Sequence, residues 1–363
     1  MKKEMLFTML FVIPIMASEA SSTLVDTEWL TARVSEKNMR IVDVRDSNKE
    51  YGQGHIPGAV YLSPDALSGP DGGGPAKLIS PEALAMLLGE MGIEANTTVV
   101  VYSGEGEFMA PYLVWALDTI GHQHAAVLDG GFSKWRSEGR SVTQDTSKIA
   151  PTRYRLPKKR NEEVRADPKE VKEIVNRGGA VLVDVSPRPL YTDDQNPKKR
   201  KGPIKGAIHH FWGDDLREDG TWRSKEELKK IYERLGVTPD KTVIVSSGQG
   251  RMSAHVYFTL KHILGYPKVK HYDGGFNEWS NFEELPVEPG APKPFGVGMV
   301  PDARKLVRER CIGCHKLKRV DKARKNKAGW EKSVARMIRK GTKLDEAERQ
   351  AVVDYLSEMQ RKE

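Results

Sequence analysis

Cysteine is the scarcest residue in this 363-residue chain. There are only two, Cys311 and Cys314, and residues 1–310 contain none. A framework of several disulfides is therefore excluded, and so is a cysteine nucleophile anywhere in the first 310 residues. Long apolar runs are absent after residue 16, so no later segment is suited to span a membrane. The length predicts two or three domains, and 38% hydrophobic with 30% charged residues is typical of a soluble globular protein.

The N-terminus has the pattern of an export signal. Two lysines precede an apolar run over residues 5–16, and Ser18 and Ala20 supply the small residues that a signal peptidase recognises. We predict a signal peptide over residues 1–20, export to the periplasm, and no membrane span after cleavage. The alternative, an uncleaved anchor, needs about 20 apolar residues, and this run has only about 12.

The middle of the chain contains two copies of one sequence unit. At an offset of 144 residues, 13 of the 38 residues over 98–135 are identical to their counterparts over 242–279. Both copies have a β-branched run, a Ser-Gly-x-Gly loop that starts at Ser103 or Ser247, and an Asp-Gly-Gly-Phe motif that we interpret as structural. Because the period is so long, it indicates a domain duplication and not a solenoid.

Strand and helix patterns alternate within each copy. In the first copy we expect a helix that begins after the N-cap Ser80 with Pro81 in its first turn. This alternation predicts α/β domains in which helices cover both faces of a parallel sheet. Such sheets bind ligands at the carboxyl ends of their strands, where the Ser103 and Ser247 loops lie, and backbone N–H groups there can converge on an anion. For the first copy we predict strands over 39–44, 60–62, 99–102 and 125–128 and helices over 81–90 and 108–120.

The two copies resemble a tandem rhodanese, the architecture of thiosulfate:cyanide sulfurtransferases. The resemblance implies two rhodanese-like domains, which we place over 24–145 and 160–288. It rests on motifs that follow one another in the same order: Val-Asp-Val-Arg-Asp at 42–46, Gly-His-Ile-Pro-Gly-Ala-Val at 54–60, a looser Gly-Pro-Ile-Lys-Gly-Ala-Ile at 202–208, and Asp-Gly-Gly-Phe at 129–132 and 273–276.

The resemblance also implies that sulfur transfer has been lost. In two-domain rhodaneses the cysteine that carries a persulfide opens a Cys-Gly-x-Gly loop in the second copy. This chain has Ser247 there, and Ser103 stands at the matching place in the first copy. A serine hydroxyl cannot hold a sulfane sulfur and offers no thiolate at neutral pH. No catalytic residue is therefore assigned in the two rhodanese-like domains.

An anion-binding pocket is still an expectation of the resemblance. The family arginine that helps to hold the substrate corresponds to Arg45 in the first copy, but to Ser186 in the second. Arg251, inside the second loop, is a candidate replacement that would contact a sulfur oxyanion. Two alternatives stay open: a plain turn without a ligand, and a serine hydrolase that takes its base from one of three histidines, His55, His209 or His210.

The two cysteines belong to a Cys-x-x-Cys-His sequence. Cys311 and Cys314 are spaced to form thioether bonds with one edge of a haem, and His315 follows as the proximal iron ligand. The alternative, a redox disulfide of the thioredoxin type, normally lies in a βαβ context, whereas this segment is rich in lysine and has helical patterns. We predict one covalent haem c.

No histidine follows His315, so a second histidine of this module cannot be the sixth iron ligand. The candidate sulfur ligands are Met337 and Met359, and helical spacing places Trp330, Val334 and Met337 on one face. The module resembles the small, all-α, class I monohaem cytochromes c, and by that resemblance Met337 is the axial ligand. The alternative is that Met337 packs in the core beside a five-coordinate haem.

Charge and composition set this module apart. Residues 301–363 carry a net charge of +9, whereas residues 1–300 carry −1. We predict a proline-rich linker over 289–296, a cytochrome c domain over 297–363 and an acidic redox partner protein. The lysine-rich stretch over 316–327 lacks aromatic residues, so we expect no nucleic-acid partner.

The function that these patterns favour is one-electron transfer. The leading hypothesis is a periplasmic c-type cytochrome with degenerate tandem rhodanese domains, linked to sulfur-compound metabolism. The alternative is an enzyme, either an oxidoreductase of thiosulfate or another sulfur compound, or a sulfurtransferase with an unrecognised nucleophile.

Overall fold

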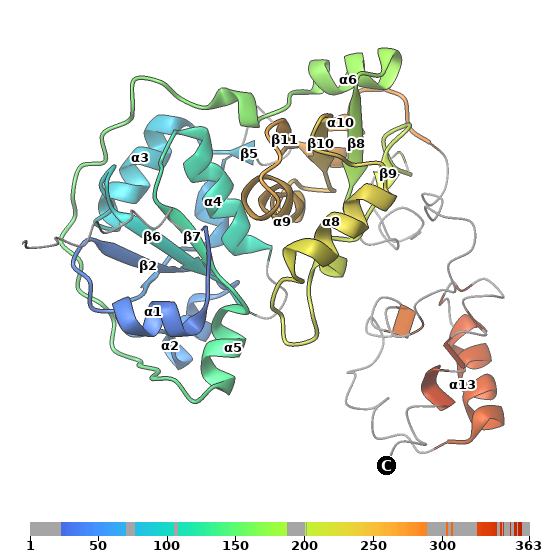
Figure 1. Ribbon diagram of the computed structural model, residues 1–363, viewed down its shortest axis with the longest axis horizontal. Helices are drawn as coiled ribbons and strands as arrows, with labels where there is room; N and C mark the ends of the chain where they lie inside the picture. The colour runs from blue at the N-terminus through green and yellow to red at the C-terminus, as the bar shows by residue number, and fades with distance from the viewer. Residues whose placement is uncertain are drawn as a thin grey trace, which may run out of the picture.

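The computed structural model (Figure 1) is described here for 23–69, 77–104, 108–186, 200, 202–288, 303, 306–307, 325–339, 342, 344, 349, 352–353 and 355–357. The predicted signal peptide, the linker over 289–296, and the residues Cys311, Cys314, His315 and Met359 lie outside these ranges. Within the ranges, no helix is long and apolar enough to cross a bilayer.

The first domain is built on a five-stranded parallel sheet with the order β1-β7-β6-β2-β3. Its central strands are continuous apolar runs, which suits strands that are buried on both faces. All four strands predicted for this copy are confirmed to within one residue at each end. The strands are β1 (Leu24–Val25), β2 (Met39–Asp43), β3 (Val60–Tyr61), β6 (Thr98–Tyr102) and β7 (Ala125–Leu128).

Helices cover both faces of this sheet. One face packs against α1 (Thr27–Arg33), α2 (Asn48–Gln53) and α5 (Gly131–Ser137). The other face packs against α3 (Pro81–Glu90) and α4 (Met109–Thr119). Helix α3 begins as predicted, because the Ser80 hydroxyl accepts a hydrogen bond from the N–H of Ala83.

The second domain repeats this plan with the strand order β11-β10-β8-β9. A single parallel bridge between Arg165 and His271 takes the place that β1 has beside β7. One face is covered by α6 (Pro168–Arg177) and α10 (Gly275–Trp279), and the other by α8 (Lys225–Arg234) and α9 (Ser253–Phe258), which continues as a π-helical turn over Thr259–Ile263. The strands are β8 (Ala180–Asp184), β9 (Ile208–His209), β10 (Thr242–Ser246) and β11 (Val269–Tyr272).

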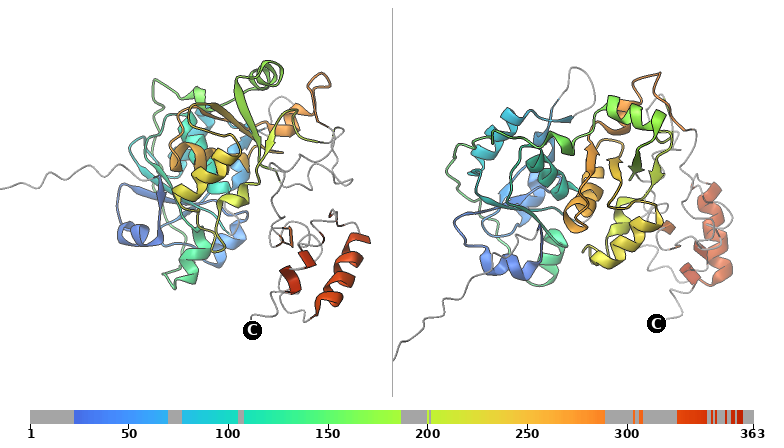
Figure 2. Two further views of the ribbon diagram at one scale, coloured as in Figure 1. Left: turned by 45° about the vertical axis from the view of Figure 1, so that its right-hand side comes forward. Right: turned by 45° about the horizontal axis from the view of Figure 1, so that its top comes forward.

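The two domains share one hydrophobic core. Helix α4 packs against α9 between the two sheets, as Figures 1 and 2 show, and the buried residues of both helices belong to the same apolar cluster. Within this contact, Asp118 of α4 accepts a 2.9 Å hydrogen bond from the Tyr257 hydroxyl of α9 and lies 2.7 Å from the His262 imidazole. The packing of α4 on α9 therefore fixes the position of one domain relative to the other.

Smaller elements connect these layers. The described residues include three short helical turns, η1 (Pro64–Leu67), η2 (Glu162–Val164) and η3 (Trp212–Asp215). Two short strands, β4 (Ser68–Gly69) and β5 (Lys77–Leu78), pair with each other in antiparallel fashion. Near the C-terminus the structure describes one long helix, α13 (Lys327–Arg339).

Candidate functional site

The Ser247 loop lies where a parallel sheet presents ligand sites, directly after β10. Gly250 has a φ of +80°, and a Cβ at this position would collide with the carbonyl oxygen of Asp273. The carbonyl of Ser247 in turn accepts a 2.8 Å hydrogen bond from the N–H of Phe276. The Ser-Gly-x-Gly loop and the Asp-Gly-Gly-Phe motif of the second copy are thus fitted closely together.

The Ser247 hydroxyl points into this structure and is fully buried. It accepts a 3.1 Å hydrogen bond from the N–H of Gly250 and lies 3.2 Å from the hydroxyl of Ser253, the first residue of α9. The Ser253 hydroxyl lies 2.8 Å from the Gly250 carbonyl, to which it donates. The hydroxyl of Ser247 therefore holds its own loop in shape.

The imidazole beside this loop belongs to His271 of β11, which the sequence did not single out. Its Nε2 lies 2.6 Å from the Gly250 carbonyl and 2.9 Å from the Ser253 hydroxyl. Because a carbonyl only accepts, the proton sits on Nε2, and this nitrogen cannot take a proton from the serines. Burial lowers the pKa of His271 to about 4, so the ring is neutral at pH 7.

The geometry argues against a serine hydrolase. The hydroxyl of Ser247 is bonded within its own loop, and the imidazole of His271 carries its proton on the nitrogen that faces the serines, so it cannot act as their base. The three histidines considered from the sequence hydrogen-bond elsewhere: His55 to the carbonyls of Tyr51 and Asp145, His209 to the carbonyl of Ser186, and His210 to the carboxylate of Asp215.

Arg251 reaches from the Ser247 loop to the first domain. Its Nη2 lies 2.7 Å from the carboxylate of Asp65 in η1 and 3.4 Å from the hydroxyl of Ser68 in β4. Ser68 also hydrogen-bonds the hydroxyl of Tyr112, whose pKa burial raises to about 12, so the phenol stays neutral. Both domains therefore contribute polar groups around Arg251, whose side chain is 25% exposed.

Ser103 makes the same backbone contact as Ser247, but the arginine of this copy has other partners. The carbonyl of Ser103 accepts a 3.0 Å hydrogen bond from the N–H of Phe132, as Ser247 does from Phe276. Arg45, the expected anion contact of this copy, is buried and bound to the carboxylate of Asp43 and the carbonyl of Gly54. Its guanidinium also lies over the Phe132 ring at 4.0 Å, so Arg45 is part of the core.

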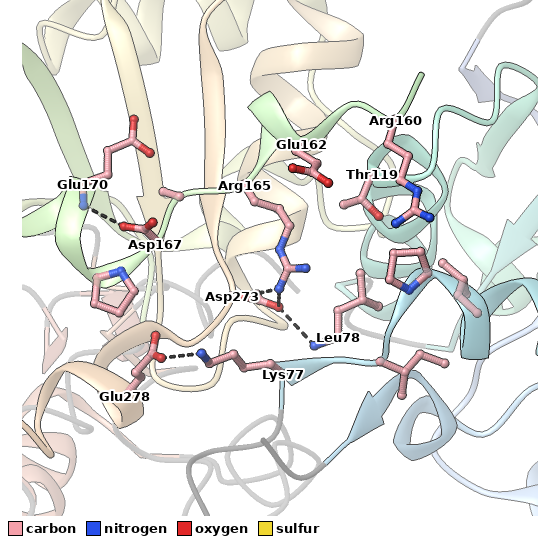
Figure 3. Close-up of a pocket in the computed structure, with 15 residues that line it drawn as sticks. Lys77, Leu78, Thr119, Arg160, Glu162, Arg165, Asp167, Glu170, Asp273 and Glu278 are labelled. Atoms are coloured by element: carbon pink, nitrogen blue, oxygen red, sulfur yellow. Dashed lines mark hydrogen bonds and ion pairs between the residues drawn. The ribbon is translucent and has the colours of Figure 1, made fainter. Parts of the chain in front are cut away.

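A cavity lies between the domains, next to Asp273. This cavity has a volume of about 460 Å³, and Figure 3 shows its charged lining. Arg165 pairs with Asp273 at 3.2 Å, and Lys77 pairs with Glu278 at 2.5 Å. The carboxylates of Asp273 and Glu278 are themselves buried and so are harder to displace than the exposed carboxylate of Asp65, which makes the cavity less suited to an anion than the surroundings of Arg251.

The described part of the C-terminal module fits a haem. Met337 packs, half-buried, on the same face of α13 as Trp330 and Val334, and this face joins an apolar cluster with Leu306, Val307, Val352, Val353 and Leu356. The buried indole N–H of Trp330 has no hydrogen-bond partner among the described residues, which suits a polar group from outside the protein, such as a haem propionate. A cysteine pair, a histidine and a methionine sulfur are the ligands that haem c takes.

Comparisons with known proteins agree with this division. The model of the rhodanese-like domain matches residues 26–138 and 167–282. The model described as "Quinohemoprotein amine dehydrogenase A, alpha subunit, haem binding" matches residues 301–362. The C-terminal module is therefore similar to a haem-binding domain.

Several relatives resemble the first three quarters of the chain. A sulfur carrier protein, TtuD of Thermus thermophilus, is 35% identical over 74% of this chain and 96% of its own length. A thiosulfate sulfurtransferase of Corynebacterium glutamicum is 32% identical over 74% and 90%. The crystal structure of an anaerobic ergothioneine biosynthesis enzyme from Chlorobium limicola is 28% identical over 76% of this chain and 72% of that one, with a TM-score of 0.68. With two matched domains, two parallel sheets and these relatives, the chain belongs to the rhodanese-like family.

Proposed function

We propose that this protein is a periplasmic c-type cytochrome of sulfur-compound metabolism, whose tandem rhodanese-like domains no longer transfer sulfur. In this proposal the rhodanese-like half binds a sulfur oxyanion or a partner protein, and one covalent haem c passes single electrons. The observation that carries it is the combination, in one chain, of Ser247 in place of the nucleophile and a haem-binding module over 301–362.

The Ser247 loop supports the loss of sulfur transfer. Relatives that cover the two rhodanese-like domains are named as a sulfurtransferase or a sulfur carrier, yet no cysteine occurs before residue 311 of this chain. At the position of the family's nucleophilic cysteine this chain has Ser247, whose hydroxyl is buried and hydrogen-bonded to Gly250 and Ser253. The surrounding loop, its glycines and its helix are all present, which suits a site that keeps its shape for binding.

Cys311, Cys314, His315 and Met337 are the residues that would hold the haem. When bound, the haem supplies reversible one-electron chemistry at its iron, and a methionine ligand raises its reduction potential. The apolar cluster around Trp330 and Val334 would exclude water from one side of the group. The net charge of +9 over 301–363 would speed docking on an acidic redox partner.

The test is a visible absorption spectrum of the protein, expressed in a host that matures c-type cytochromes. We expect haem absorbance that stays with the chain after denaturation and acid–acetone extraction, and that is lost in Cys311→Ala/Cys314→Ala. An intact soluble chain with extractable haem, or with none, would contradict the proposal. Fractionation of the host would check the periplasmic location.

The second candidate function is oxidation of a bound sulfur compound. One observation favours it: Arg251, in the Ser247 loop, has a partly exposed side chain. The oxidised protein is mixed in turn with sulfide, sulfite and thiosulfate, and the reduced haem bands are followed with time. Rapid reduction by one compound, lost in Arg251→Gln, supports an oxidoreductase. Reduction only by dithionite supports an electron carrier whose rhodanese-like half is a docking module.

A further inference from the structure

The ion pair between Arg251 and Asp65 joins the two domains, and its two side chains differ strongly in solvent exposure. The arginine is three-quarters buried beside the Ser247 loop, whereas the side chain of Asp65 is 86% exposed. Exposed carboxylates contribute little to such pairs, because water competes for them and salt screens them. The Asp65 carboxylate can therefore leave Arg251 at small cost, while the guanidinium, which is three-quarters buried, still has the Ser68 hydroxyl beside it.

Apart from the carboxylate of Asp65, the polar side chains near Arg251 include hydroxyls that can donate. Ser68 lies 3.4 Å from the guanidinium and hydrogen-bonds Tyr112, and burial keeps the Tyr112 phenol neutral. In the same loop, Gly248 is half-buried and Gln249 is exposed. The one carboxylate bonded to Arg251 in the described structure is that of Asp65. A second anion that replaced this carboxylate would meet a guanidinium and a hydroxyl in the same positions.

From this arrangement we propose that Asp65 is an internal competitor for the anion site at Arg251. A small sulfur oxyanion binds by displacing the Asp65 carboxylate from Nη2, so Asp65 sets the affinity and Arg251 supplies the attraction. The inference rests on the proposed binding role of the rhodanese-like half, and it adds a specificity residue from the opposite domain. Monoanions, which gain less Coulomb attraction from Arg251 than dianions do, are the weaker ligands.

Thiosulfate binding to the full-length holoprotein, measured by isothermal titration calorimetry in low-chloride buffer at pH 7.5, tests the proposal. Asp65→Asn keeps the size of the side chain but removes the competing charge, and we expect it to bind about two- to fivefold more tightly than the native protein. Arg251→Gln should bind at least about tenfold more weakly. The matched control is Asp240→Asn, which removes an exposed charge ahead of β10, at the other end of the same strand.

Three results would overturn the inference. Equal affinity in Asp65→Asn and the native protein would show that Asp65 does not compete, and equal affinity in Arg251→Gln would show that the arginine is not the contact. Absence of thiosulfate binding even in Asp65→Asn would remove the site itself. The haem spectrum of the same samples keeps these failures separate from the electron-transfer proposal, because a normal spectrum leaves that proposal standing. Circular dichroism confirms that each variant is folded.

Discussion

Asp129 and Asp273 hold the two domains together in the same way from opposite sides. Asp129, in the first domain, accepts a 2.9 Å hydrogen bond from the N–H of Trp222 in the second. Asp273, in the second, accepts a 3.1 Å hydrogen bond from the N–H of Leu78 in the first. Both the two acceptors and the two donors are 144 residues apart, so the duplication has produced a reciprocal pair of interdomain contacts.

Removing either carboxylate should destabilise the protein, and Asp273 should matter more. Asp273→Ala leaves the N–H of Leu78 without its acceptor and also deprives Arg165 of its partner, which should lower the free energy of unfolding by about 3 kcal/mol. Asp129→Ala should cost about 2 kcal/mol at a pH below the raised pKa of Asp129, where its carboxyl is protonated and carries no cost of ionisation. Urea unfolding followed by tryptophan fluorescence measures both, and Asp46→Ala, at an exposed position, is the control. A loss no larger than that of the control would show that these contacts are not important for stability.

The pH dependence of stability should reveal two opposing groups. Burial raises the pKa of Asp129 from 3.8 to about 6, so the folded state binds more protons between these values and ionisation lowers stability by about 3 kcal/mol as the pH rises. Burial lowers the pKa of His271 from 6.5 to about 4, so stability rises by about 3 kcal/mol over a similar window. In the native protein the two effects largely cancel.

Asp129→Asn separates these effects, because the amide oxygen still accepts from Trp222 but no longer titrates. We expect the free energy of unfolding of this variant to rise steeply between pH 4 and 6.5, whereas that of the native protein changes little through these two groups. Urea titrations at half-unit pH steps provide the curves. Parallel curves for the two proteins would show that Asp129 has an ordinary pKa.

The fold could be predicted from the sequence because its signals are local or repeated. Ser80 and Pro81 mark the start of α3, and the valines of β6 and β10 mark strands that are buried on both faces. The role of Asp129 and Asp273 was hidden for a physical reason: each partner is a backbone N–H, which any residue except proline supplies. The offset of 144 between the two aspartates, and between Leu78 and Trp222, was visible in the sequence. It acquires meaning only once the packing of α4 on α9 is known.

The candidate site was predictable in part. The place of Ser247 follows from strand order, whereas the contact between Arg251 and Asp65 joins residues 186 positions apart and depends on how the domains meet. The sequence could not predict that Arg45 is unavailable to a ligand, because the same residues can form either an anion site or a buried ion pair between Arg45 and Asp43. His271 was missed since its neighbours in the sequence give no sign that β11 runs beside the loop.

Restoring the thiol should restore part of the family's chemistry. In Ser247→Cys, the N–H of Gly250 that now bonds the hydroxyl would stabilise a thiolate, which attacks the outer sulfur of thiosulfate, forms a persulfide and releases sulfite. Cyanide then takes the sulfur as thiocyanate. We expect thiocyanate formation at least about tenfold above the native background. Ser103→Cys is the matched control and should stay at background, because the arginine of this copy, Arg45, is buried and bound to Asp43 and so is not available to an anion. Equal activity in the two variants would show that the second loop has no special competence.

The axial role of Met337 can be tested without disturbing the packing of α13. Met337→Leu keeps an apolar side chain of similar size against Trp330 and Val334 but removes the sulfur. If Met337 binds the iron, the reduction potential should fall by on the order of 0.1 V and the charge-transfer band of a methionine–iron(III) bond should disappear. Met86→Leu, at a methionine that is 70% exposed on α3, should change neither quantity. The same losses in Met359→Leu but not in Met337→Leu would assign the ligand to Met359, and no loss in either variant would favour a five-coordinate haem.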